Sequence, residues 1–191
     1  MLSLAKALFT EQDQNTQASV VLCLASTIDR ASDLDPTRLS KLLSRFEKLL
    51  KRDDFKVKPV LLTLVESIVA AGGASDHAQL KSLIPCLVEA LSSEDWATRK
   101  AAAEMLMVVA DVERDFLSEF KGECVRVFEN RWFDKVKLVR GVMNQMLEAW
   151  KLVPDVSDEV SPPPKSQSSS KVLTGQQANP SIRQKWDRLT L

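Results

Sequence analysis

The sequence predicts an all-α fold built from repeated helical hairpins. The 191 residues are 45% hydrophobic, contain only five glycines and lack tyrosine, a balance that favours helices over a sandwich or barrel. Apolar residues recur at the spacing of amphipathic helices. Similar turn sequences return at intervals of about 40 residues, which is typical of repeats made of two helices each.

The clearest hairpin is expected around two apolar stripes in the first half of the chain. Its first helix follows Asp35-Pro36, because aspartate caps a helix and proline suits the first turn. Its second helix ends at Gly72-Gly73, since glycine readily adopts the left-handed conformation of a helix end. Two such helices joined by a few residues form an antiparallel hairpin. The stripes are Leu39, Leu42, Leu43, Phe46, Leu49 and Leu50, then Val57, Val60, Leu61, Leu64, Val65, Ile68 and Val69.

Two further pairs of helices follow. A stripe over residues 80–91, opened by Ser75 or Asp76 as cap, precedes a helix over residues 96–110. That second helix is apolar on nearly every face, which indicates a helix sandwiched between neighbours. Residues 113–131 and 135–150 supply the next pair.

The spacing of the turns makes these hairpins one repeat. Residues 54–60 align with residues 95–101 at an offset of 41, and these align with residues 133–139 at a further offset of 38. Periods near ~40 residues with two helices each match HEAT or armadillo units, whose stacking supplies a continuous core. We therefore predict a HEAT/armadillo-like right-handed α-solenoid of about three and a half hairpins over residues 1–153, with only half of the first leading helix.

The composition changes after Pro154. The stretch 161–170 consists only of serine, proline, lysine and glutamine, and it cannot bury enough apolar surface to offset the entropy of ordering. Residues 154–191 are therefore predicted to be a disordered tail, although residues 180–191 could form a short amphipathic segment.

Charge and targeting patterns exclude several classes of protein. Lys+Arg and Asp+Glu both number 26, and zero net charge disfavours a nucleic-acid partner. No signal peptide and no run of the ~18 apolar residues needed for membrane insertion is visible. Cys23, Cys86 and Cys124 each lie in an apolar helical run, so we expect small buried hydrophobes in a reducing compartment.

No catalytic or cofactor site is predicted. The single histidine, His77, has no cysteine or carboxylate at metal-ligand spacing and is expected to be a solvated surface residue. Gly72-Gly73 lacks the lysine and the flanking strand of a phosphate-binding loop. We predict a non-enzymatic protein without metal or cofactor.

A basic edge is the remaining candidate for function. The turns within hairpins project from one edge of a HEAT solenoid, and residues 48–58 and 126–140 each contain five basic and two acidic residues, a local excess of +3. Such an edge suits an acidic protein surface. Alternatively, the bases are solvated and the nearby aromatics close the ends of the core; these aromatics are Phe55, Trp96, Trp132 and Phe133. Trp96 is expected to be partly buried, with its role in stability dominant.

Four segments resemble the helical-repeat domain of plant Tortifolia/Spiral-type microtubule-associated proteins: residues 9–15, 92–104, 133–137 and 146–151. The most specific is the run Ser-Glu-Asp-Trp-Ala-Thr-Arg-Lys-Ala-Ala-Ala-Glu that ends at Glu104, and the resemblance extends to about Pro164. It implies a TOG-like HEAT array in the cytoplasm that binds tubulin or cortical microtubules and influences their dynamics and directional growth. Because TOG-like arrays engage tubulin through turns within repeats, it implies contacts by Phe55, Lys56, Lys58, Trp96, Arg99, Lys100, Lys135, Lys137 and Arg140.

A second function remains open from the sequence. The solenoid could be an adaptor that captures a peptide or helix on its concave face, like the related actin-associated, nuclear-envelope armadillo proteins. Sensitivity to salt separates the two, because binding by a basic edge weakens with ionic strength and binding in an apolar groove does not. The sequence does not determine whether the protein binds free tubulin, the microtubule lattice or a filament end, nor does it determine the oligomeric state.

Overall fold

The computed structural model describes residues 2–31, 33–74, 77–131 and 133–155. The predicted caps Ser75 and Asp76, Trp132 and the predicted tail from residue 156 onward lie outside the described residues, so the domain boundary stays a prediction. None of the described helices has the length and apolarity needed to cross a membrane. The described residues form eight α-helices and no strand: α1 (Leu2–Thr10), α2 (Gln14–Arg30), α3 (Pro36–Leu50), α4 (Lys58–Ala70), α5 (His77–Ala90), α6 (Trp96–Val112), α7 (Ser118–Arg131) and α8 (Lys137–Lys151).

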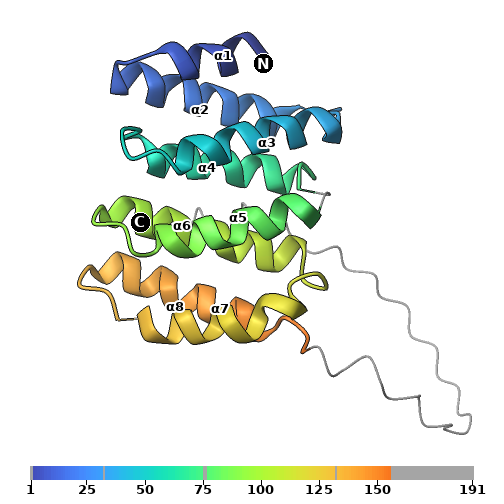
Figure 1. The fold of residues 1–191 in the computed structure, drawn as a ribbon, viewed down its shortest axis with the longest axis vertical. Helices are drawn as coiled ribbons and strands as arrows, with labels where there is room; N and C mark the ends of the chain where they lie inside the picture. The colour runs from blue at the N-terminus through green and yellow to red at the C-terminus, as the bar shows by residue number, and fades with distance from the viewer. Residues whose placement is uncertain (1, 32, 75–76, 132, 156–191) are drawn as a thin grey trace, which may run out of the picture. The chain divides into compact units, whose positions relative to one another are not determined.

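The helices form four consecutive antiparallel hairpins (Figure 1). Each odd-numbered helix packs on the even-numbered helix that follows it, and α2, α4, α6 and α8 pack successively on one another. The all-α prediction is confirmed, and the stacking is that of a helical solenoid. In the first hairpin α1 has nine residues against 17 in α2, which agrees with the shortened leading helix expected there.

The helix boundaries differ from the predicted ones in the last hairpin. The helix expected from residue 113 begins at Ser118, because Phe116 and Leu117 donate backbone hydrogen bonds to the Glu113 carbonyl and form a turn. The helix expected from residue 135 begins at Lys137. Here the Asp134 carboxylate accepts the Val136 amide at 2.8 Å and holds the preceding residues in a turn.

The end of α4 follows the glycine prediction. Gly72 has φ of 82° and its amide donates to the Val69 carbonyl, while the Gly73 amide donates to the Ile68 carbonyl. These two bonds satisfy carbonyls that the helix leaves unpaired at its C-terminus. A Cβ atom at Gly73 would lie 2.5 Å from the Ile68 side chain and 2.9 Å from Leu39 Cβ, so glycine is also required for the close approach to α3.

The core is densest around α6, which packs between α4 and α8. Most of its side chains from Ala102 to Ala110 are buried, as expected of a sandwiched helix. The fully buried Trp150 of α8 joins these layers: its indole N–H donates to the Leu106 carbonyl at 2.9 Å. Its ring also packs edge-on against Phe128 at 5.2 Å between centroids.

The cysteine prediction is correct for two residues and wrong for the third. Cys86 and Cys124 are buried, and burial raises the pKa of the Cys86 thiol and raises that of Cys124 to about 12, so both remain protonated near neutral pH. Cys23 is exposed. Helix α2 turns Val21, Leu24, Ala25 and Ile28 to the core, and this stripe leaves Cys23 on the outer side of the helix.

We predict that Trp150→Ala lowers the free energy of unfolding by ~3–5 kcal/mol, because it removes a large buried ring. The matched variant Trp96→Ala, at a tryptophan that is 45% exposed, should cost about 1 kcal/mol or less. Urea unfolding followed by circular dichroism measures both. Equal losses in the two variants would contradict the placement of Trp150 as the core tryptophan.

Candidate functional site: the edge of intra-repeat turns

Four turns connect the two helices of each hairpin and follow one another along one edge of the stacked hairpins (Figure 1). We define each turn from the last residue of the odd-numbered helix to the first residue of the even-numbered helix. The first turn is residues 10–14, the second 50–58, the third 90–96 and the fourth 131–137. Together they are called the turn edge.

Even-numbered helices start in two different ways. Asp13 and Asp95 cap α2 and α6, and their carboxylates accept backbone amides of the first helical turn at 2.7–3.1 Å. Helices α4 and α8 instead follow Val57 and Val136, which make no side-chain cap, and open on Lys58 and Lys137. Hairpins one and three therefore share one kind of helix start, and hairpins two and four share the other.

The charge of the turns alternates in the same order. The first and third turns each carry two carboxylates and no base, a charge of −2, whereas the second and fourth turns each have an excess of two bases, a charge of +2. A continuous basic edge is therefore not present. The charged residues are, in the first turn, Glu11 and Asp13; in the second, Lys51, Arg52, Lys56 and Lys58 with Asp53 and Asp54; in the third, Glu94 and Asp95; and in the fourth, Arg131, Lys135 and Lys137 with Asp134.

The lysines at the starts of α4 and α8 are not engaged in internal ion pairs. Within the part of the chain that the structure describes, no carboxylate pairs with Lys58, Lys135 or Lys137. The Lys56 ammonium donates to the Asp53 carbonyl at 3.0 Å, which leaves its charge uncompensated. Other cations of the second turn are neutralised: Lys51 pairs with Glu47 at 2.6 Å, and Arg52 with Asp54 at 2.5 Å.

Arg99, a predicted contact residue, lies inside a link between the third and fourth turns. Its guanidinium makes two hydrogen bonds to the Asp134 carboxylate, at 2.6 and 3.0 Å. The pair is largely buried, with side chains 15% and 9% exposed. Nη1 of Arg99 also donates to the carbonyls of Ser93 and Glu94, which fixes the third turn onto α6.

Arg140 makes the same kind of contact in the fourth turn. Its Nη1 donates to the carbonyls of Asp134 and Lys135, six and five residues earlier, as Arg99 does in the third turn. The structure thus equates Asp95 with Val136, the residues that precede α6 and α8. The predicted offset of 38 between these repeats is wrong by three residues. The two turns have the same length, and their equivalent residues, Arg99 and Arg140, are 41 positions apart. Lys100 is also occupied, by an ion pair with Glu104.

The Arg99 pair shifts the pKa of both partners. The hydrogen bond from Arg99 lowers the pKa of Asp134, against a smaller opposing effect of burial, and the Val136 amide adds to the lowering. The pKa of Arg99 is raised by the same hydrogen bond. Both groups are therefore charged at neutral pH, and the pair holds the two turns together.

The aromatic candidates divide between core and surface. Phe55 is only 5% exposed, so its ring is not available to a partner. Trp96 is 45% exposed, which agrees with the expected partial burial but argues against the dominant role in stability that was expected of it. Phe133 is 75% exposed, and the Arg140 guanidinium lies 5.6 Å from its ring centre. Phe9, which was not predicted, is 38% exposed at the end of α1.

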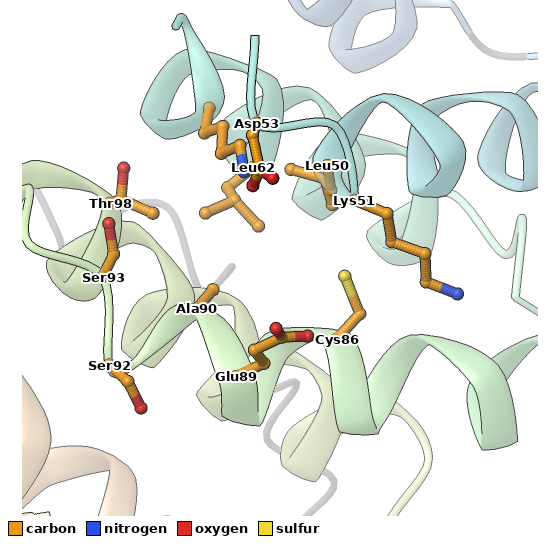
Figure 2. A pocket seen from close by; sticks show the side chains of 11 residues that line it. Leu50, Lys51, Asp53, Leu62, Cys86, Glu89, Ala90, Ser92, Ser93 and Thr98 are labelled. Carbon is orange, nitrogen blue, oxygen red and sulfur yellow. The ribbon is translucent and has the colours of Figure 1, made fainter. Parts of the chain in front are cut away.

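Two clefts separate successive turns. One of about 320 Å³ lies between the first and second turns, and one of about 350 Å³ between the second and third. Figure 2 shows Asp53, Cys86 and Glu89 around the second cleft, with the Lys51 ammonium pointing away from it. The residues that line this cleft carry both signs of charge, because Lys58 lines it together with Asp53 and Glu89. The third and fourth turns are bridged by the Arg99–Asp134 pair.

His77 lies at the start of α5, on a different element from the turn edge. Its side chain is exposed as predicted, and its ring stacks on Phe116 at 4.1 Å between centroids. Its Nε2 lies 3.7 Å from a Glu113 carboxylate oxygen. Across the described ranges no group of three His, Cys, Asp or Glu side chains is placed to hold a metal ion.

Comparison with known proteins relates most of this chain to one plant family. Residues 1–152 match the family model described as TORTIFOLIA1 N-terminal. TORTIFOLIA1-like protein 3 of Arabidopsis thaliana is 54% identical over 176 residues, which are 90% of this chain and 28% of that protein. TORTIFOLIA1-like protein 4 of the same plant is 47% identical over 166 residues, 87% of this chain and 26% of the relative.

A more distant relative carries a functional name. The Arabidopsis thaliana protein called microtubule-associated protein TORTIFOLIA1 is 34% identical over 143 residues, 75% of this chain and 16% of that protein. The chain spans about a quarter of the length of the two relatives above. The matched region includes all four hairpins and the whole turn edge.

We predict that Asp134→Asn destabilises the fold by about 2 kcal/mol at neutral pH, because Arg99 loses its charged partner. The folded-state pKa of Asp134 lies below its unfolded value of about 3.9. The contribution of the wild-type carboxylate is therefore fully present above that value and is lost as the pH falls through the lowered folded-state pKa. Urea titrations from neutral pH down to about pH 3 should show the two proteins converging. A difference that stays constant over this range would contradict the role of the ion pair.

Proposed function

Because the chain belongs to the TORTIFOLIA1 family, we propose that it binds microtubules through the second and fourth turns of the turn edge, as a non-enzymatic cytoskeletal protein. The observation that carries this proposal is the pair of helix starts at Lys58 and Lys137. Both occupy the first helical position, both follow an uncapped valine, and neither has a carboxylate partner within the described residues.

These lysines work against the stability of the helices that they open. The N-terminus of a helix carries partial positive charge, so a cation there forgoes or opposes a favourable interaction of ~0.3–1 kcal/mol. The absence of a capping side chain costs about 1 kcal/mol more. Residues that break the rules for helix starts in two equivalent hairpins are best explained by a contact outside the fold.

The two basic turns are separated by one turn of opposite charge. Lys56 and Lys135 lie two residues before Lys58 and Lys137, so each basic turn presents two lysines at matching positions. The third turn between them carries the half-exposed ring of Trp96. We assign the lysines to electrostatic attraction of an acidic surface and Trp96 and Phe133 to apolar contact within it.

The partner is proposed to be the acidic surface of tubulin, either free or in the microtubule. One relative is named as a microtubule-associated protein, and the family resemblance implies action at cortical microtubules, on their dynamics and on directional growth. Among the predicted contact residues, Phe55, Arg99, Lys100 and Arg140 act inside the protein, by burial, by ion pairing or by holding a turn. The proposed contact set is therefore Lys56, Lys58, Trp96, Phe133, Lys135 and Lys137.

The test is reversal of the four lysines, Lys56, Lys58, Lys135 and Lys137, to glutamate. Each reversal changes the charge by two, so the second and fourth turns change from +2 to −2. Attraction becomes repulsion, and co-sedimentation with stabilised microtubules should fall by at least about tenfold in affinity, corresponding to ~1.4 kcal/mol. Circular dichroism should show an unchanged fold, since none of the four lysines pairs with a described carboxylate and their reversal therefore breaks no ion pair.

The matched control reverses four exposed cations elsewhere on α1, α3 and α7, namely Lys6, Lys41, Arg45 and Arg126. It changes the net charge by the same amount but leaves the turn edge intact. Binding of the wild type and of the control should weaken as salt rises. Equal binding by the turn-edge variant and the wild type would reject the basic-turn mechanism and favour capture on the concave face.

A further inference from the structure

The charge of the turn edge alternates from turn to turn, so a partner surface fits it best when its own charges alternate in the opposite sense. In order from the first turn to the fourth the charges are −2, +2, −2 and +2. A partner of a single sign attracts two turns and is repelled by the other two. The complementary series is +2, −2, +2 and −2, and this is the same edge in reverse order.

We infer that a second copy of this chain docks on the turn edge in antiparallel orientation. In that pairing the first turn faces the fourth turn of the other copy, and the second turn faces the third. All four contacts join opposite charges. The arrangement has two-fold symmetry and closes as a dimer, as isologous interfaces do.

Other ways of pairing two edges are less favourable. A parallel pairing in register places every turn on a turn of the same sign. A parallel pairing shifted by one turn restores opposite signs but leaves one turn of each copy unpaired, and it continues into an open chain of subunits. The antiparallel pairing alone uses all four turns and closes.

The residues that face each other carry opposite charges, and all of them are exposed except Lys58 and Glu11, which are half-buried. Lys56 and Lys58 of one copy would meet Glu94 and the neighbouring Glu89 of the other, all outside helix caps. Glu11 and Asp13 would meet Lys135 and Lys137. The exposed rings of Phe9, Trp96 and Phe133 lie on the same edge and would lose solvent contact. A contact limited to four turns is small, so the dimer is weak and sensitive to salt.

Self-pairing covers the lysines that the microtubule proposal uses. The two kinds of binding then exclude each other: a chain bound to a microtubule presents no free turn edge, and a dimer presents no free basic turns. The inference shares this surface with the proposed function but does not depend on it, since it is tested without microtubules.

The experiment is a charge exchange followed by sedimentation velocity on the full chain at low salt. Variant A carries Lys56→Glu and Lys58→Glu, which change the second turn from +2 to −2. Variant B carries Glu89→Lys and Glu94→Lys. Together they change the summed charge of the third turn and the adjacent Glu89 from −3 to +1. Neither variant touches the cap Asp95 or the Arg99–Asp134 pair, and circular dichroism checks that each folds.

Wild type should sediment as a monomer–dimer mixture that shifts to monomer as salt rises. A alone and B alone should be monomeric, because each faces like charge at two of its four contacts. An equimolar mixture of A and B should dimerise again, since each second turn then meets a third turn of opposite sign. A wild type that stays monomeric over the concentration series, variants that remain dimeric on their own, or a mixture that fails to associate would each overturn the inference.

Discussion

The turn edge depends on a side chain at the fourth position of the even-numbered helices. Gln17, Arg99 and Arg140 occupy this position in α2, α6 and α8, and each donates to the carbonyl of the residue six positions earlier. That bond folds the turn back onto the first turn of the helix and satisfies a carbonyl that would otherwise face solvent. Helix α4 has Leu61 at this position, which cannot donate such a bond, and its turn is the longest of the four. The Arg52–Asp54 ion pair and the hydrogen bond from Lys56 to the Asp53 carbonyl hold this turn instead.

This constraint divides the basic residues of the edge into two groups. Arg99 and Arg140 donate to backbone carbonyls and so hold the turns in a fixed shape, and Arg99 also binds the Asp134 carboxylate. The planar guanidinium is suited to such multiple bonds, whereas a lysine ammonium is a compact charge on a flexible stem. The open cations of the helix starts are accordingly lysines, Lys58 and Lys137. Arg99 and Arg140 thus hold the edge in shape, whereas Lys58 and Lys137 add positive charge that no described carboxylate pairs.

The sequence predicted the fold more completely than the site, for physical reasons. Helix stripes, the Asp35 cap and the Gly72 terminus are local patterns, and each lies where it was predicted. The bond between Arg99 and Asp134 joins residues 35 positions apart, so no periodicity reveals that this arginine is occupied. Phe55 was open to two interpretations, and only the packing of its turn shows that it is buried. The acidic first and third turns, by contrast, were visible: a signed charge for each turn, rather than a search for basic clusters, finds them in the sequence.

Capping chemistry and surface charge are linked along this edge. A turn that starts its helix with an aspartate cap gains stability from that carboxylate and is acidic for the same reason, as at Asp13 and Asp95. A turn that presents lysine at the first helical position does so without a cap, as at Lys58 and Lys137. The alternation of charge is thus also an alternation between turns whose charged side chain caps a helix and turns whose charge does not stabilise the helix start. It follows that the sign of the first and third turns cannot be reversed at the caps without loss of stability, whereas the lysine turns can change sign at little cost to the fold.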